Sequence, residues 1–305
     1  VLLDGAPSAG VVVTQGGNPK RWTTGEDGKV VVEVDFGVLG DKFVMGAHPD
    51  ARTRGLNVYE STTEIVIELT SFDTSDNEDY VFKDPGEPGM SHVIEKCAHC
   101  HLTVSENWFG SAHRTSGKNP LLYDLYSGTA HTWNSEEDCI SRGGAWVDGL
   151  SPGTGNVIKQ CQVAPSVGDF GSNGACADCH TPGIDGKIGG RDLLEASGHS
   201  YDYGVHCEVC HHVESVDLDG GPGVSGSLKI LRPSEPPPIP GVGPVNPLLF
   251  CPDPDIANRY MGCAPREHFR ESPFCAGCHE YNQPSMDVEN PVNTERWPDG
   301  LIPVH

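Results

Sequence analysis

The chain has few hydrophobic residues and few positive charges. Hydrophobic residues make up 36% of its 305 residues, and no apolar run approaches the roughly 18 residues that a membrane-spanning helix needs. Lys and Arg number 20 against 43 Asp and Glu, and the formal net charge of -23 disfavours nucleic acid and anionic membranes as partners. With 38 Gly and 25 Pro, the chain has too little apolar side-chain surface for a self-sufficient core. Part of the core must therefore come from something other than side chains.

The beginning of the sequence lacks a leader. The chain starts at Val1 rather than Met, and no basic segment followed by an apolar stretch opens it. This start is typical of an exported protein whose signal peptide has been removed. We therefore expect an extracellular or cell-surface protein.

One pentapeptide, Cys-x-x-Cys-His, occurs four times. In covalent c-type haem attachment, two thiols bond to one haem and the adjacent His reaches its iron. Zinc knuckles and redox dithiols also use Cys-x-x-Cys, but neither explains a His after all four copies. We predict four covalently bound haem c groups, whose porphyrins supply the missing core. The motifs are Cys97-x-x-Cys100-His101, Cys176-x-x-Cys179-His180, Cys207-x-x-Cys210-His211 and Cys275-x-x-Cys278-His279.

A second axial ligand for each iron must come from outside the motifs. The chain has fourteen His but only four Met, so a second His is favoured over Met. Iron with two His ligands is closed to substrate, and we therefore predict an electron carrier and not an enzyme. Two alternatives stay open: a reductase or oxidoreductase of a small nitrogen compound with one open haem, and a soluble periplasmic electron shuttle.

The candidate distal ligands lie close to the motifs. One follows the first motif, and two precede the third and fourth motifs. The last directly follows the His of the third motif, so two neighbouring residues there would bind two different irons. These four are His113, His199, His268 and His212, with His206 in reserve and His92 as a weaker candidate. The other doubtful candidates are His48, His99, His131 and His305.

Four Cys lie outside the motifs. Local pairing of Cys139 with Cys161 and of Cys251 with Cys263 closes a short loop in each case. We predict both disulfides, with a structural role in segments of low apolar content; free redox-active thiols are the alternative.

Residues 1–85 contain no Cys and alternate as strands do. Several short strands separated by turn signals at Gly25–Gly28 and His48–Asp50 predict an all-β sandwich. The stretch resembles the carboxypeptidase-regulatory-like sandwich in Gly10-Val-Val-Val-Thr14 and Thr23-Thr-Gly-Glu-Asp-Gly-Lys-Val30. This module is expected to serve in structure or contact, with edge strands free to pair with a neighbouring chain. The expected strands are Val11–Thr14, Lys29–Phe36, Lys42–Met45, Glu64–Leu69 and Tyr80–Phe82.

Residues 86–305 are predicted to form a loop-rich, mostly irregular multihaem cytochrome c domain with short helices. A Pro-rich stretch at 232–247 within it is predicted to be an extended, polyproline-like strap.

Residues 90–285 resemble the multihaem cytochromes related to cytochrome c554 and hydroxylamine oxidoreductase. The resemblance rests on Trp108-Phe-Gly-Ser-Ala-His-Arg114 after the first motif, and on the positions of His199 and His268 ahead of the third and fourth. Four haems and the Cys139-to-Cys161 insert make the chain most similar to tetrahaem extracellular filament cytochromes of the outer-membrane cytochrome E type.

That resemblance implies a conductive homopolymer with head-to-tail contacts, in which electrons hop along haems with two His ligands. It also implies that one haem takes its distal His from the next subunit, and His92 or His48 is the expected donor. Other multihaem cytochromes or extracellular electron acceptors are the expected partners.

Overall fold

The computed structural model divides the chain into two compact units. Unit 1 comprises Val1–Lys83, Cys210–Glu214 and Leu231–Glu271, and unit 2 comprises Asp84–Val209, Ser215–Ile230 and Ser272–His305. The structure describes residues 1–93, 96–127, 135–141, 145–150, 157–162, 176–191, 193, 196–221, 223–234, 238–239, 243–244, 249–252, 262–284 and 301–304.

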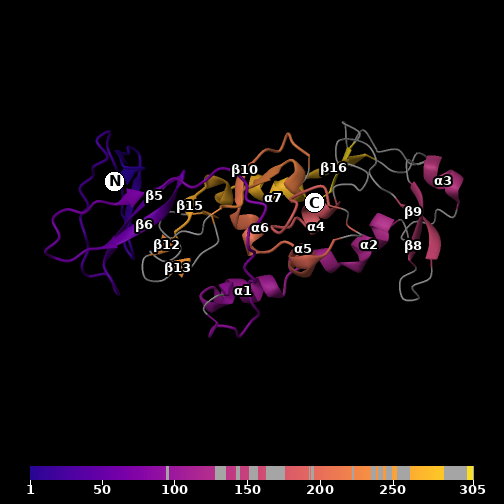
Figure 1. The fold of residues 1–305 in the computed structure, drawn as a ribbon, viewed down its shortest axis with the longest axis horizontal. Helices are drawn as coiled ribbons and strands as arrows, with labels where there is room; N and C mark the ends of the chain where they lie inside the picture. The colour runs from indigo at the N-terminus through magenta and orange to yellow at the C-terminus, as the bar shows by residue number, and fades with distance from the viewer. Residues whose placement is uncertain are drawn as a thin grey trace. The chain divides into compact units, whose positions relative to one another are not determined.

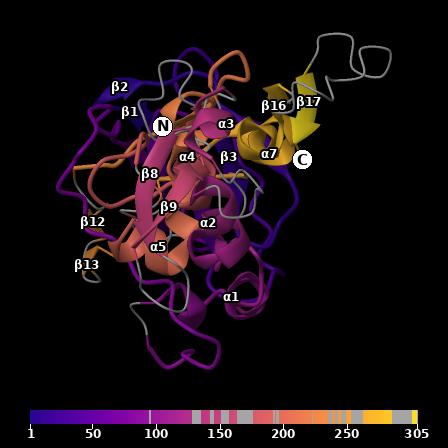
Figure 2. The ribbon, with the colours of Figure 1, turned by 90° about the vertical axis from the view of Figure 1, so that its right-hand side faces the viewer.

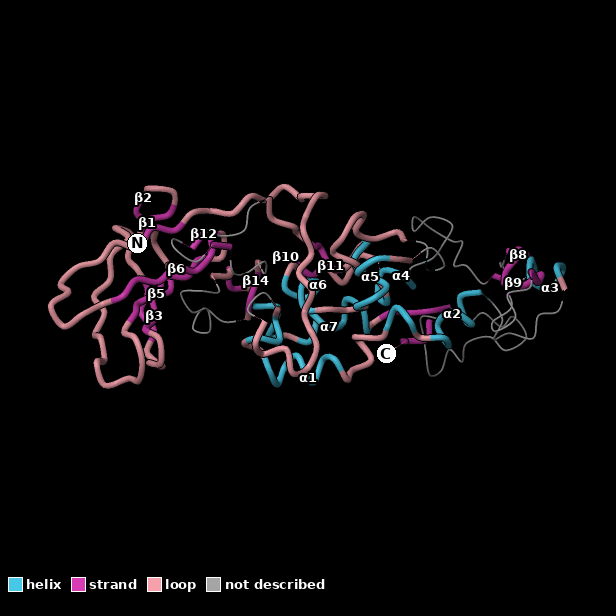
Figure 3. Tube along the Cα trace, turned by 60° about the horizontal axis from the view of Figure 1, so that its bottom comes forward, coloured by secondary structure: helices cyan, strands magenta, loops and turns pink. Residues whose placement is uncertain are grey.

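Loops make up most of the described chain, with several small sheets and short helices among them (Figure 3). The longest described helices have eight residues each. Frequent Gly and Pro keep helices short, because Gly costs conformational entropy in a helix and Pro removes a backbone donor. The prediction of a loop-rich chain with short helices is confirmed. Within the described residues, no helix is long and apolar enough to cross a membrane.

Two small sheets form the N-terminal part of unit 1 (Figure 1). Buried side chains of these strands and of residues next to them, among them Val11, Val44 and Ile67, form one hydrophobic core. The larger sheet has the antiparallel order β4 (Arg21–Thr23), β3 (Val12–Gln15), β5 (Phe43–His48) and β6 (Ala51–Asn57). The smaller has the order β2 (Ala6–Pro7), β1 (Leu2–Leu3) and β7 (Glu68–Leu69).

Two of the five expected strands are present close to their expected places. Val11–Thr14 corresponds to β3 and Lys42–Met45 to β5. The turn expected at Gly25–Gly28 is present, with the Gly28 amide donating to the Gly25 carbonyl at 2.9 Å.

Residues 29–36 form no strand, which corrects the expectation. Val30, Val32 and Val34 pack against the core and so explain the alternating pattern. However, the Gln15 side chain replaces a neighbouring strand: its amide donates to the Asp35 carbonyl at 2.7 Å and accepts from the Asp35 amide at 2.8 Å. Periodicity reports which side chains are buried and not whether the backbone has a ladder partner.

Two further strand expectations also need correction. Residues 80–82 form no strand, because Val81 is largely exposed and Tyr80 contacts His212 instead. Of Glu64–Leu69, only the last two residues pair, as β7.

A second core in unit 1 surrounds two short parallel strands, β14 (Phe250–Cys251) and β15 (Ala264–Pro265). Leu231, Leu249, Phe250 and Ala264 are buried there, with Phe72 and Phe269 packed against them. The predicted Cys251–Cys263 disulfide is confirmed. The side chains of Cys139 and Cys161 lie outside the part of the chain that the structure describes.

Of the predicted strap, the structure describes residues 232–234, 238–239 and 243–244. Within it, β12 (Pro238–Ile239) and β13 (Gly243–Pro244) pair antiparallel.

Unit 2 is built from short helices and two-stranded sheets. Figure 2 shows β16 beside β17 and, elsewhere, β8 with β9. Its helices are η1 (Cys97–His99), α1 (Leu102–Phe109), η2 (Ser116–Lys118), α2 (Pro120–Ser127), α3 (Glu136–Ser141), α4 (Cys176–His180), α5 (Gly198–Tyr203), η5 (Gly223–Ser225) and α7 (Ser272–His279). Its strands are β8 (Ala145–Leu150), β9 (Val157–Gln162), β11 (Leu228–Ile230), β16 (Tyr281–Pro284) and β17 (Leu301–Val304). The chain passes between the units within α6 (Cys207–His211) and β10 (Val213–Val216), and η6 (Glu267–Arg270) belongs to unit 1.

Candidate haem-binding sites

Each Cys-x-x-Cys-His motif lies on a helical turn. The second, third and fourth motifs end α4, α6 and α7 at their His, and the first forms η1 with His101 as the N-cap of α1. Residues i, i+3 and i+4 of a helix share one face. The second, third and fourth motifs therefore present both thiols and the imidazole on one side of their helix, as attachment to one porphyrin requires, whereas the first motif begins as a 3₁₀ turn and its His101 lies at the start of α1.

Within the described part of the chain, none of the eight motif Cys forms a disulfide. Within unit 2, the Cys97 thiol hydrogen-bonds to the Cys207 thiol, and Cys179 hydrogen-bonds to Cys278. The Cys207 thiol and burial raise the pKa of Cys97. These contacts bring a Cys of the first motif to one of the third, and a Cys of the second to one of the fourth.

Two consecutive histidines at the end of α6 are fixed by backbone carbonyls of unit 1. His211 Nδ1 lies 2.8 Å from the Phe250 carbonyl oxygen, and His212 Nδ1 lies 2.7 Å from that of Leu231. A carbonyl only accepts, so each Nδ1 carries the proton and donates it. The lone pair is then on Nε2, which is the arrangement of an imidazole that ligates a metal.

His268, on η6, belongs to the same cluster in unit 1. It hydrogen-bonds to the backbone of Val213, and burial followed by the charge of Arg266 lowers its pKa. Phe269 stacks on both imidazoles, with ring centroids 5.3 Å from His211 and 4.8 Å from His268. His268 was singled out because it precedes the fourth motif in the sequence, but in unit 1 it lies beside the His of the third.

A second cluster, in unit 2, joins His113 to the second and fourth motifs. The rings of His113 and His279 have centroids 5.9 Å apart. Burial and then the charge of His279 lower the pKa of both His113 and His180, which favours the neutral imidazole that binds metal. The His180 imidazole hydrogen-bonds to the Ser116 backbone, but its Nδ1 atom is buried with no partner among the described residues, in contrast to the Nδ1 atoms of His211 and His212.

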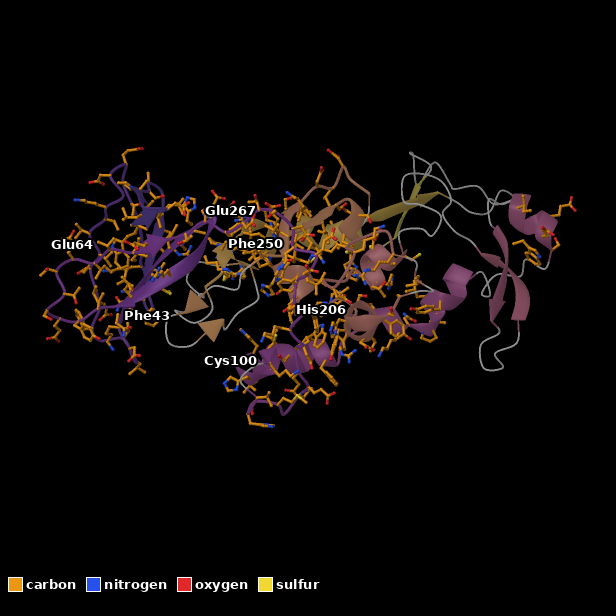
Figure 4. All side chains as sticks on the ribbon, viewed as in Figure 1. Phe43, Glu64, Cys100, His206, Phe250 and Glu267 are labelled. Carbon is orange, nitrogen blue, oxygen red and sulfur yellow. A yellow bond between two sulfur atoms is a disulfide. The ribbon has the colours of Figure 1, made fainter. Side chains whose placement is uncertain are left out.

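The other predicted ligands are distributed as follows. His206, labelled in Figure 4, is 1% exposed directly before α6. His199 is exposed on α5, with its ring 6.0 Å from that of Tyr203. His101 and His92 are exposed, and His99 contacts the Ser91 carbonyl. His48 hydrogen-bonds to the Asp50 amide at 3.1 Å, and His131 and His305 lie outside the described residues.

The described residues fit a covalent haem. Each motif offers two Cys that form no disulfide within the described residues and a His on or next to the same helical turn, and a pocket lined by Pro88, Gly89, Ala98, Leu102 and Glu106 opens at the first motif. No group of three or more His, Cys, Asp or Glu gathers as a metal-ion site in the part of the chain that the structure describes. A haem does not need such a group of protein ligands, because the porphyrin itself supplies four ligands to its iron.

Sequence reasoning missed the residues that surround His212. The Tyr80 hydroxyl lies 3.3 Å from His212 Nε2. The Arg232 side chain, 2% exposed, forms an ion pair with Asp76 at 2.6 Å. Arg232 holds the pKa of Asp76 below its ordinary value. Asp76 and Arg232 are 156 residues apart, and no local pattern in the sequence connects them.

A comparison of the chain with known protein families finds a match for one segment. Residues 150–212 match the family of cytochrome c554 and c-prime. The matched segment contains the second and third motifs together with His199, His206 and His212, and it covers about a fifth of the chain. The match supports a multihaem c-type cytochrome with covalently bound haem c, involved in electron transfer. No curated protein and no solved structure matches the chain.

The same match corrects one prediction. The sequence predicted an electron carrier and not an enzyme, because the surplus of His was expected to close every iron. The cytochrome c554 family is related to hydroxylamine oxidoreductase-like enzymes, which points to enzymatic chemistry. A surplus of His in the sequence does not establish that each iron receives two of them.

Proposed function

We propose that the chain is a tetrahaem cytochrome that carries electrons outside the cell as a conductive filament. The observation that carries this proposal is that four Cys-x-x-Cys-His motifs lie on short helical turns, and none of their Cys forms a disulfide within the described residues. The contacts of Cys97 with Cys207 and of Cys179 with Cys278 support short separations between haems of different motifs. Electron transfer along a series of haems requires short distances between neighbouring haems.

The chain's own residues position and tune each site. Bound haem supplies the iron that gains and loses one electron. The motif thiols would attach the porphyrin covalently, and the motif His would bind its iron. The Phe250 and Leu231 carbonyls fix the tautomer and the ring direction of His211 and His212, and they raise the basicity of both imidazoles.

The proposed polymer is extracellular and has head-to-tail contacts. A contact in which one subunit donates a ligand to the next is heterologous, so it extends without closing. We take His92 as the donor in preference to His48. His92 is exposed, whereas His48 is partly buried and hydrogen-bonded to the Asp50 amide. The two N-terminal sheets would form the carboxypeptidase-regulatory-like sandwich and provide a contact surface.

A second candidate function is oxidation or reduction of a small nitrogen compound at one haem with an open position. The relation of the matched family to hydroxylamine oxidoreductase-like enzymes favours it. EPR spectroscopy of the purified holoprotein with and without hydroxylamine separates the candidates. A high-spin signal that changes with hydroxylamine indicates an open haem, and low-spin signals alone indicate that all irons are closed.

The primary test combines mass spectrometry with electron microscopy. Intact mass should show four covalent haems, and negative-stain images of the purified protein should show filaments. His92→Ala should abolish filaments and leave four haems attached, whereas His48→Ala should leave filaments intact. Fewer than four haems would contradict the tetrahaem proposal, and normal filaments from His92→Ala would contradict the donated ligand.

A further inference from the structure

The Cys251–Cys263 disulfide lies next to the carbonyl that fixes His211. β14 consists of Phe250 and Cys251 only, and the Phe250 carbonyl oxygen is the one 2.8 Å from His211 Nδ1. Phe250 is fully buried and is labelled in Figure 4. The position of one backbone carbonyl thus depends on a strand of two residues, one of which is half of a disulfide.

Backbone hydrogen bonds and the packing of Phe250 hold this short strand together with the disulfide. The Ala264 amide donates to the Leu249 carbonyl at 2.8 Å, and the Arg266 amide donates to the Cys251 carbonyl at 2.9 Å. The Arg266 guanidinium lies 4.3 Å from the centroid of the Phe250 ring. A two-residue ladder is marginal without further support. The covalent bond to Cys263 therefore limits how far β14 can move from β15.

The other half of the disulfide is anchored to the larger sheet. The Cys263 carbonyl accepts the Thr53 amide at 3.2 Å and the Thr53 hydroxyl at 2.8 Å. Arg52 adds a hydrogen bond to the Gly262 carbonyl at 3.0 Å. Within unit 1, a continuous series of contacts therefore leads from β6 through the disulfide to the Phe250 carbonyl and His211.

We propose that the Cys251–Cys263 disulfide positions the Phe250 carbonyl against His211, so that its redox state sets the potential of the third haem. This inference rests on the proposed haem ligation by His211. Two molecules of a thiol reductant would give two electrons and two protons, so the S–S bond breaks, two Cys thiols form and the reductant becomes a disulfide. Cys251 and Cys263 are 7% and 5% exposed, so the exchange requires local opening.

The direction of the effect follows from the hydrogen bond. A His that donates its Nδ1 proton to a carbonyl is a more basic ligand, and a more basic ligand favours ferric over ferrous iron. When the disulfide is broken, β14 is less restrained and the hydrogen bond from His211 weakens. The third haem then becomes easier to reduce, and its midpoint potential moves to a more positive value.

The test uses the holoprotein with Cys251→Ser/Cys263→Ser, and Cys139→Ser/Cys161→Ser as the matched control. Mass spectrometry first establishes that four haems are attached. Potentiometric titration followed by EPR should then show one haem shifted to a more positive potential in Cys251→Ser/Cys263→Ser, with the other three unchanged. Unchanged potentials, a shift of all four haems, or the same single shift in the control would overturn the proposal.

A second measurement applies if the variant fails to assemble. Wild-type holoprotein is treated with a phosphine reductant, its new thiols are alkylated, the reductant is removed and the haems are reoxidised before titration. Motif Cys are thioethers in the holoprotein, so peptide mapping assigns any alkylation to the remaining Cys. Alkylation at Cys251 and Cys263 with no shift overturns this inference and leaves the proposed function intact, whereas absence of covalent haem contradicts the proposed function itself.

Discussion

The third motif differs from the second and fourth in what holds its histidines. His211 and His212 each have Nδ1 fixed by a carbonyl of unit 1, from segments that lie outside the motif. In unit 2, the His180 imidazole hydrogen-bonds to the Ser116 backbone, its Nδ1 atom is buried with no hydrogen-bond partner among the described residues, and His279 is exposed. Backbone carbonyls from outside the motif therefore orient His211, the proposed motif ligand of the third haem, and the adjacent His212, whereas we expect the second and fourth sites to depend more on bound haem to complete their packing.

The largest expected effect is the difference in hydrogen-exchange protection between a variant that lacks the second haem and one that lacks the third. Cys176→Ser/Cys179→Ser and Cys207→Ser/Cys210→Ser should each lose one of the four haems. Loss of the second haem removes core from unit 2, so amide exchange there should accelerate by more than about tenfold, equivalent to about 1.4 kcal/mol. Loss of the third haem should leave residues 231–234 and 262–271 protected. Hydrogen exchange followed by mass spectrometry measures both, and equal loss of protection in both variants would refute the contrast.

The next effect concerns the turn that positions His113. Gly204 has φ +57°, and a Cβ there would lie 2.4 Å from both the His113 carbonyl oxygen and Ser116 Oγ. Gly204→Ala should lower the free energy of unfolding by about 3 kcal/mol through strain and overpacking, and it should alter one haem EPR signal. Gly186→Ala is the matched control, because Gly186 has φ +61° with no atom within 4 Å of its Cβ position. If both variants lose the same free energy of unfolding, the loss comes from backbone strain alone and not from the contacts of the added Cβ at Gly204.

A smaller effect is expected in unit 1. Asp76→Asn leaves the buried Arg232 guanidinium without its carboxylate, at a cost of about 2 kcal/mol, reduced because Asp76 itself is partly exposed. Arg232 lowers the pKa of Asp76, so this contribution is present above the ordinary carboxyl pKa and is lost as the pH falls through the lowered value. Chemical denaturation at pH 7 and at pH 3 should therefore show a smaller difference between variant and wild type at pH 3. Asp73→Asn, at an exposed carboxylate of the same loop, is the control.

The smallest effect is confined to alkaline pH. Burial raises the pKa of Tyr123 to about 12, and the Tyr123 hydroxyl donates to the Gly117 carbonyl at 2.8 Å. The folded-state pKa is raised, so this stabilisation is complete below pH 10 and is lost as the pH rises towards 12. Thermal unfolding of Tyr123→Phe should be less sensitive to pH over this interval than that of the wild type. Parallel curves for the two proteins would rule out the contribution of Tyr123.

Local features of the molecule could be predicted from the sequence, and partners distant in the chain could not. The motif turns, the turn at Gly25–Gly28 and the Cys251–Cys263 pair depend on residues that are near one another in the chain. The strand expected at residues 29–36 was wrong because the Gln15 side chain takes the place of a backbone ladder. His268 lies beside His211 because Phe269 stacks on both rings. This packing could not be read from the sequence, in which His268 is closest to the fourth motif.

The contact between Thr53 and the Cys263 carbonyl also determines how late in folding unit 1 is completed. The two residues are 210 positions apart, so this edge of the larger sheet acquires its partner only after most of the chain has appeared. Contacts of such separation form late, because the loop between them must first lose its freedom. The first three motifs precede residue 263 in the chain. On a chain that emerges from its N-terminus, those motifs are therefore available for haem attachment before the fold around His211 is complete.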